Sequence, residues 1–214
     1  MKCRTTWSGT PWNKPMQEST AAPELPGYVR EKRTIDLGKA NGVALLGLLP
    51  ITVVYVLPFY LLWGHRYTWV TIKASLDNGL GAAAGGWALF LLLGGIVVHE
   101  LIHGITWAIF AKRGFRSIRF GVLWKMLTPY CHCKEPLRVR QYIIGALMPA
   151  IILGFTPAML AMALGSAKLL VFALFFTVAA MGDFMIIQLI RKERADTLVL
   201  DHPSEAGCYV FRAG

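Results

Sequence analysis

The sequence predicts an all-α membrane protein with four transmembrane helices and a short cytosolic β-hairpin or re-entrant segment between the second and third helices. Four predominantly apolar stretches are each about 20 residues long, which is the length that a helix needs to cross a bilayer. Of the 214 residues, 55% are apolar and only 16% are charged, and the mean hydropathy is +0.50. This composition is typical of membrane proteins rather than of soluble globular domains.

The charge pattern predicts how the chain is oriented in the bilayer. The formal net charge is +10, and most Lys and Arg residues stand in three places: the N-terminal arm, the connection between the second and third spans, and the C-terminal tail. Cytosolic segments of membrane proteins carry such an excess. We therefore expect a multi-pass protein of the bacterial cytoplasmic membrane with both termini in the cytosol. The basic residues show no aromatic-basic pattern of a nucleic-acid-binding protein, so the lipid bilayer, and not DNA or RNA, is the predicted partner.

The N-terminal third contains an arm and the first span. Residues 1–27 are polar and rich in proline, which opposes a long helix, so we expect this arm to be disordered. The four-helix domain is predicted to cover residues 28–211 and to begin with a short strand or interfacial segment. The first span is expected at residues 42–63, where Pro50 and Pro58 predict kinks that membrane helices tolerate.

The other three spans follow at short intervals. The second span, residues 82–111, is rich in small residues, which favours close helix packing in a membrane. A basic connection with an apolar interior then predicts the hairpin or re-entrant segment, although an ordinary amphipathic interface segment fits that pattern nearly as well. The third and fourth spans are expected at residues 142–164 and 168–190. The remaining residues form a short polar cytosolic tail in which residues 207–211 could form a strand.

One motif in the second span predicts a metal site. His99 and His103 stand four residues apart, so on a helix both imidazole rings lie on one face and can hold one zinc ion. Glu100 follows the first histidine, where it can act as a general base toward a zinc-activated water. The H-E-x-x-H pattern is short enough to arise by chance. Its place near the middle of a lipid-spanning helix argues for function, because polar residues are costly there.

A catalytic zinc ion usually takes three protein ligands, and Asp183 is the candidate for the third. It is the only acidic residue in the fourth span. His103 lies nine residues before Lys112 and Asp183 lies eight residues before Arg191. At about 1.5 Å per residue, both side chains lie roughly 12–14 Å from the basic boundary and can meet at one ion. The alternative is that Asp183 bonds a backbone or hydroxyl group of a neighbouring span.

Other ligand sets fit the sequence less well. The metzincin extension of the motif requires Gly and His at positions occupied by Thr106 and Ile109. Cys131, His132 and Cys133 are metal-binding residue types, but three consecutive residues cannot all face one ion from regular structure. A role for His132 as a proton donor or oxyanion partner stays open. With a cytosolic location, all four cysteines, Cys3, Cys131, Cys133 and Cys208, are expected to be thiols.

The order of these features resembles intramembrane zinc metalloproteases of the site-2 protease type. It resembles more closely a domain-of-unknown-function family of bacterial membrane proteins described as "putative zincin peptidase". The pieces that carry this resemblance are His99–Gly104, Leu147–Pro149, Met181–Asp183 and Asp201–Pro203, within residues 27–211. The chain departs from site-2 proteases in having no Asn after Asn78 and in having Gly before Asp183.

The resemblance implies zinc held by His99, His103 and Asp183, with Glu100 as the general base. It also implies hydrolysis of a peptide bond in or near the membrane, in a membrane protein or a membrane-associated peptide. The departures leave the oxyanion partner and the mode of substrate binding unassigned, and the oligomeric state is open. The alternative function is a non-catalytic membrane scaffold or adaptor that keeps the zincin frame.

Overall fold

The structure is a computed structural model of the chain and describes residues 24–68, 73–74, 82–123, 128–203 and 205–214. Nearly all of the predicted N-terminal arm, residues 1–27, lies outside the described residues. The helices of the described part are α1 (Leu37–Trp63), α3 (Ala82–Phe110), α4 (Val139–Pro149), α5 (Thr156–Leu164), α6 (Ala167–Ala179) and α7 (Met181–Ile190), with shorter helical segments η2 (Gly64–Arg66), η3 (Gly114–Ser117) and η4 (Ala150–Phe155).

Among the described residues, four helical stretches are long and apolar enough to cross a membrane. They are Leu45–Arg66, Gly85–Phe110, Val139–Leu164 and Ala167–Ile190, in close agreement with the four predicted spans. Their outward faces carry many exposed apolar side chains, including Leu46, Leu61, Trp87 and Ile109. An apolar surface of this extent requires cover by lipid or protein, so the helices are compatible with a multi-pass membrane protein.

The last two spans are interrupted at positions that shape the site. The third span runs through α4, the π-helical segment η4 and α5. The fourth span breaks at Ala180, which caps the end of α6, so that α7 starts afresh at Met181. The fourth span, predicted at residues 168–190, is present as Ala167–Ile190 and contains this break. The break places Asp183 in the first turn of a helix, where a carboxylate is favoured by the helix dipole.

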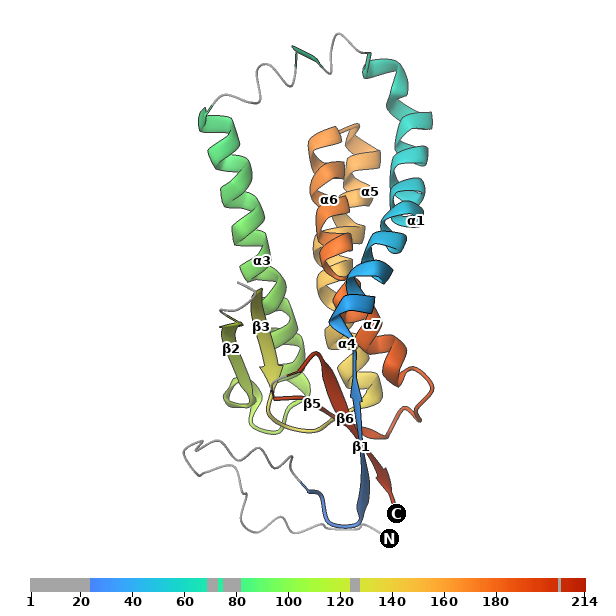
Figure 1. Ribbon diagram of the computed structural model, residues 1–214. Coiled ribbons are helices and arrows are strands. Elements are labelled where there is room, and N and C mark those ends of the chain that lie inside the picture. The colour runs from blue at the N-terminus through green and yellow to red at the C-terminus, as the bar shows by residue number, and fades with distance from the viewer. Residues whose placement is uncertain (1–23, 69–72, 75–81, 124–127, 204) are drawn as a thin grey trace.

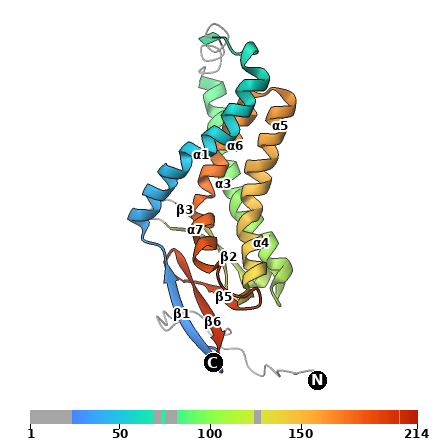
Figure 2. The same cartoon turned by 90° about the vertical axis from the view of Figure 1, so that its right-hand side faces the viewer.

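A four-stranded antiparallel sheet corrects the prediction of an all-α fold. The described strands of this sheet lie in the order β1 (Tyr28–Thr34), β6 (Gly207–Ala213), β5 (Leu198–Asp201) and β4 (Leu137–Arg138). The sheet lies at one end of the helices, where β1 leads into α1 and the C-terminus is also found (Figures 1 and 2). Two of its strands were expected as possible short strands, but their pairing was not predicted, because β1 and β6 come from opposite ends of the chain.

The predicted hairpin is present as β2 (Ile118–Leu123) and β3 (Thr128–Cys133), which pair antiparallel. It lies beside the lower half of α3 (Figure 1). At Gly104 an added Cβ atom would lie 2.4 Å from Cζ of Phe120, so a larger residue there would push β2 away from the helix. The small residue directly after His103 therefore brings the hairpin close to the predicted metal ligands.

A buried cluster connects the sheet with the spans. It includes Trp107 of α3, Tyr142 of α4, Ile190 of α7 and Val199 of β5. These side chains come from four elements that are distant in sequence, so the end of the bundle near the sheet is its best-packed region. The predicted ligands lie on α3 and α7, next to this region.

Candidate metal centre

His99 and His103 lie on the buried face of α3. Their side chains stand one helical turn apart, and the residues are only 7% and 3% exposed. The two rings meet edge to face, with centroids 4.9 Å apart. The helix therefore aims both Nε2 atoms at the same point, as the four-residue spacing predicts.

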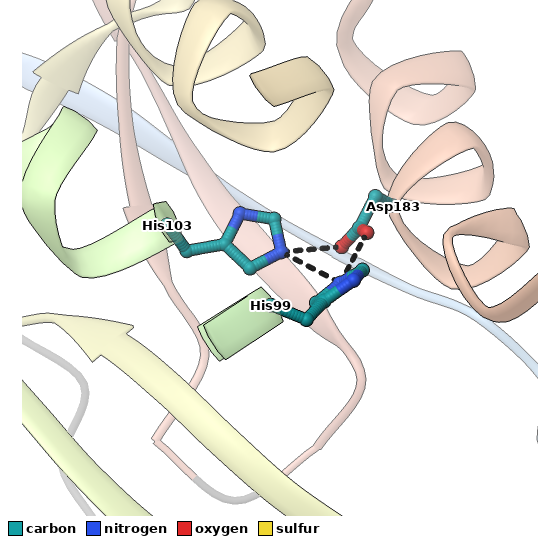
Figure 3. Close-up of side chains that lie close together, drawn as sticks. All are labelled: His99, His103 and Asp183. Carbon is teal, nitrogen blue, oxygen red and sulfur yellow. Dashed lines mark hydrogen bonds and ion pairs between the residues drawn. The ribbon is translucent and has the colours of Figure 1, made fainter. Parts of the chain in front are cut away.

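Asp183 reaches that point from α7. Its Oδ2 lies 3.2 Å from Nε2 of His99, and its Oδ1 lies 3.3 Å from Nε2 of His103. The two Nε2 atoms are 3.2 Å apart. Figure 3 shows the three side chains pointing toward one another from α3 and α7. The depth argument from sequence, which paired Asp183 with His103, is consistent with this geometry.

This arrangement fits a tetrahedral zinc ion. Zinc–ligand bonds of about 2.0–2.1 Å at the tetrahedral angle place ligand atoms about 3.3 Å apart. The two Nε2 atoms are 3.2 Å apart, and each lies 3.2 or 3.3 Å from a different carboxylate oxygen of Asp183. With one ligand atom from each residue, the three atoms lie within 4.8 Å of one another. Among the described residues, His99, His103 and Asp183 form the group of at least three side chains that could hold a metal ion. Three ligands also leave one tetrahedral position for water or substrate.

The protein orients His103 through its second ring nitrogen. Nδ1 of His103 lies 2.9 Å from the carbonyl oxygen of Gly145 in α4 and donates its proton to it. This leaves the Nε2 lone pair free for a metal ion, which is the usual role of such a partner. Nδ1 of His99 is buried and finds no hydrogen-bond partner among the described residues.

Two aromatic side chains pack against His103 in a continuous stack. The ring of Trp107 stacks on His103 with centroids 5.0 Å apart, and the ring of Tyr142 stacks on Trp107 at 5.1 Å. Trp107 Nε1 also donates to the carbonyl oxygen of Tyr142 at 3.2 Å. Gly145 makes this packing possible, because a Cβ atom there would lie 2.0 Å from Trp107 Nε1.

Glu100 faces a cavity beside the ligands. The cavity has a volume of about 240 Å³, with His99 and Glu100 at its polar end and apolar side chains elsewhere. The backbone N–H of Cys131 in β3 hydrogen-bonds the Glu100 carboxylate. The general-base role remains a prediction, and the position beside His99 and next to open space is what that role requires.

The segment Cys131–Cys133 does not join the metal group. It lies in β3, and burial raises the pKa of the Cys133 thiol to about 12 and the pKa of Cys131 still further above its ordinary value. Such thiols are protonated at neutral pH, and the described group of side chains that could hold a metal ion does not include them. Nδ1 of His132 lies 3.9 Å from Asp201 Oδ2.

The sequence reasoning missed the residues that surround the ligands. Trp107 follows His103 by four residues, so its position on the same helix face was available as a signal. The Gly145 carbonyl is a backbone group and leaves no signal in the sequence. Asp201, in the segment Asp201–Pro203 that contributes to the family resemblance, is the last residue of β5, and His202 follows it.

Comparison with known proteins gives one match. The model of the family described as "putative zincin peptidase" matches residues 92–198, half of the chain. That segment contains His99, Glu100, His103 and Asp183. No curated protein and no solved structure matches the chain.

Proposed function

The chain belongs to the family described as "putative zincin peptidase", and from this membership we propose that it is a membrane-embedded zinc metallopeptidase that hydrolyses a peptide bond in or near the bilayer. The observation that carries the proposal is the convergence of His99, His103 and Asp183, whose ligand atoms, one from each residue, lie within 4.8 Å of one another. Two imidazoles and one carboxylate are a ligand set of catalytic zinc sites.

Glu100 is assigned the proton transfers. Zinc bound to the three ligands would polarise the scissile carbonyl and give a water-derived nucleophile at neutral pH. Glu100 accepts the proton as the water oxygen adds to the carbonyl carbon, and the C–N bond then breaks. The leaving nitrogen departs with the proton that Glu100 returns, so each cleavage consumes one water.

The outer edge of β3 lies beside Glu100. The N–H of Cys133 donates to Asp201 and the N–H of Cys131 hydrogen-bonds Glu100, so alternate backbone groups point away from β2. Pro129 is the next residue in this alternation and has no N–H. This edge therefore lies along the proposed reaction site. Because its N–H groups are already bonded or absent at these three positions, the edge offers no backbone donors there for strand addition by a substrate peptide.

The basic residues support a cytosolic location for the sheet. Arg113 and Arg116, which follow α3, and Arg191 and Lys192, which follow α7, stand at the ends of their spans nearest the strands. In the proposed orientation this end faces the cytosol of a bacterial cell, with both termini on that side. Reporter fusions at the C-terminus, active only on one side of the membrane, test this orientation.

The first test of the function is the metal content of detergent-purified protein. We expect about one zinc ion per chain in the wild type and its loss in Asp183→Ala. Asp196→Ala removes an exposed tail carboxylate and serves as the matched control, which should keep zinc. Glu100→Gln should keep zinc but stop peptide cleavage. The peptidase proposal would be contradicted if the folded wild type holds no zinc, or if Glu100→Gln keeps full activity in cells. Either result would favour the alternative function, a non-catalytic membrane scaffold.

A further inference from the structure

The cavity beside Glu100 is half-open and is lined by residues of three elements. Ile96, one turn before Glu100 on α3, forms one wall, and Phe175 and Ala179 on α6 form the opposite wall. Pro129 of β3 closes the side toward the hairpin. His99 and Glu100 occupy one end, so the groups proposed to carry the chemistry border an otherwise apolar space.

A close contact between α6 and α3 lies beside the cavity. Phe176 is 0% exposed and belongs to a buried cluster with Ile102 and Leu153. Its ring rests on α3 at Gly95, where an added Cβ atom would lie 2.2 Å from Cζ of Phe176. The Phe176 ring therefore lies directly between α6 and α3 beside the cavity.

The volume of the cavity limits the size of the group that it can bind. Its volume of about 240 Å³ lies below the roughly 300–1,000 Å³ of cavities that bind whole small molecules. It suits one large side chain. Phe175 is 40% exposed and Ala179 is exposed as well, so the cavity opens on the outer face of the bundle and a side chain can enter from there.

The chemistry of the walls selects the type of side chain. A polar side chain would lose water on entering and find only apolar atoms along most of its length, which is unfavourable. An acidic side chain would in addition meet the carboxylate of Glu100. A branched or aromatic apolar side chain gains free energy in proportion to the area it buries.

We propose that this cavity is the subsite for a branched or aromatic apolar residue next to the scissile bond, and that Ala179 sets its depth. The inference rests on the proposed peptidase function and names the substrate class of that site. Ala179 is exposed, so a larger residue there narrows the subsite without disturbing the buried core.

The first experiment digests a random-sequence peptide library with zinc-loaded, detergent-purified protein and identifies the new termini by mass spectrometry. Wild type should cut with Leu, Ile, Phe or Met enriched on one side of the bond. Ala179→Phe should shift that position to Gly, Ala or Ser, changing the ratio of large to small residues by about tenfold or more. Ala163→Leu, an exposed change on α5, should keep the wild-type preference.

The second experiment needs no turnover. Peptide hydroxamates that bear a benzyl, isobutyl or methyl side chain bind zinc through the hydroxamate group, and their affinity is measured on zinc-loaded protein. Wild type should prefer the benzyl and isobutyl compounds over the methyl compound by about tenfold or more. Ala179→Phe should abolish or reverse this order, whereas Ala163→Leu should preserve it.

The two experiments separate the inference from the function on which it rests. The subsite is overturned if the wild type cleaves peptides without a side-chain preference, or if Ala179→Phe keeps the wild-type preference. The proposed peptidase function would stand in both cases. Equal hydroxamate affinities in wild type also overturn the subsite. A clear preference for the larger hydroxamates that Ala179→Phe removes supports the subsite, even if zinc-loaded wild type cuts no peptide. The absence of cleavage would then count only against the proposed hydrolysis.

Discussion

The hydroxyl of Tyr142, in the first turn of α4, donates a hydrogen bond to the carboxylate of Asp201 at the end of β5. The other oxygen of Asp201 accepts from the backbone N–H of Cys133 in β3 at 2.8 Å. Asp201 is buried, so one carboxylate joins the sheet, the hairpin and α4. Because Tyr142 stacks on Trp107 and Trp107 stacks on His103, these contacts continue to the candidate metal centre.

Tyr142→Phe should destabilise the protein without removing zinc. The variant keeps the aromatic stack but deprives the buried carboxylate of one donor, which costs about 1–3 kcal/mol. We expect a lower temperature of thermal unfolding in detergent and an unchanged zinc content. Tyr60→Phe, on the exposed face of α1, is the matched control and should unfold like the wild type. Zinc loss in Tyr142→Phe at a temperature where the protein is folded would contradict this division of roles.

Gly145→Ala should weaken zinc binding. The new Cβ atom would lie 2.0 Å from Trp107 Nε1, so either the indole or the backbone of α4 must move. Both movements disturb the hydrogen bond from His103 to the Gly145 carbonyl. Loss of such an outer contact to a metal ligand typically weakens affinity by about 10–100-fold, which competition with a chelator of known zinc affinity measures.

Gly94→Ala is the control for that experiment. Gly94 also lies within a spanning helix, and no neighbouring atom lies within 4 Å of its added Cβ position. Zinc affinity should stay at the wild-type value. If Gly145→Ala also keeps wild-type affinity, the Gly145 carbonyl does not orient His103.

Removal of zinc should lower the stability of the wild type but not of Asp183→Ala. A ligand that binds only the folded state stabilises it by about 2.7 kcal/mol at a concentration of 100 times its dissociation constant. We expect the unfolding temperature of the wild type to fall on treatment with a chelator and to recover when zinc is restored. Asp183→Ala should unfold at one temperature under all three conditions. An equal response in both proteins would place the stabilising zinc elsewhere.

The convergence of the three candidate ligands could be predicted because each carries a signal in its own segment. His99 and His103 are four residues apart, and Asp183 is the only acid in an apolar span. The spans were predictable because length and apolar content suffice to recognise them. The break at Ala180 and the pairing of the sheet could not be predicted from such local signals. Alanine favours helix continuation, and the pairing of β1 with β6 joins residues that are nearly the whole chain apart.

The contacts of Glu193 link the sheet to the helix that carries Asp183. Arg212 of β6 donates to its two carboxylate oxygens at 2.8 and 3.0 Å, and Arg33 of β1 donates at 2.6 Å. Arg33 also donates to the carbonyl oxygen of Leu189 in the last turn of α7. Hydrogen bonds from Arg212, and then from Arg33, lower the pKa of Glu193 from 4.5 to about 2.

This lowered pKa predicts a specific loss of stability in acid. The folded state favours the ionised carboxylate, so the contribution of Glu193 is fully present above its ordinary pKa of 4.5 and disappears as the pH falls toward about 2. Glu193→Gln should therefore be less stable than the wild type at pH 6, and this difference should shrink steadily between pH 4.5 and pH 2. Unfolding temperatures at several pH values measure it. Asp196→Asn alters an exposed ion pair with Arg194, for which solvent screening predicts a much smaller difference at every pH. A difference for Glu193→Gln that stays constant from pH 6 to pH 2 would show that its ionisation does not stabilise the fold.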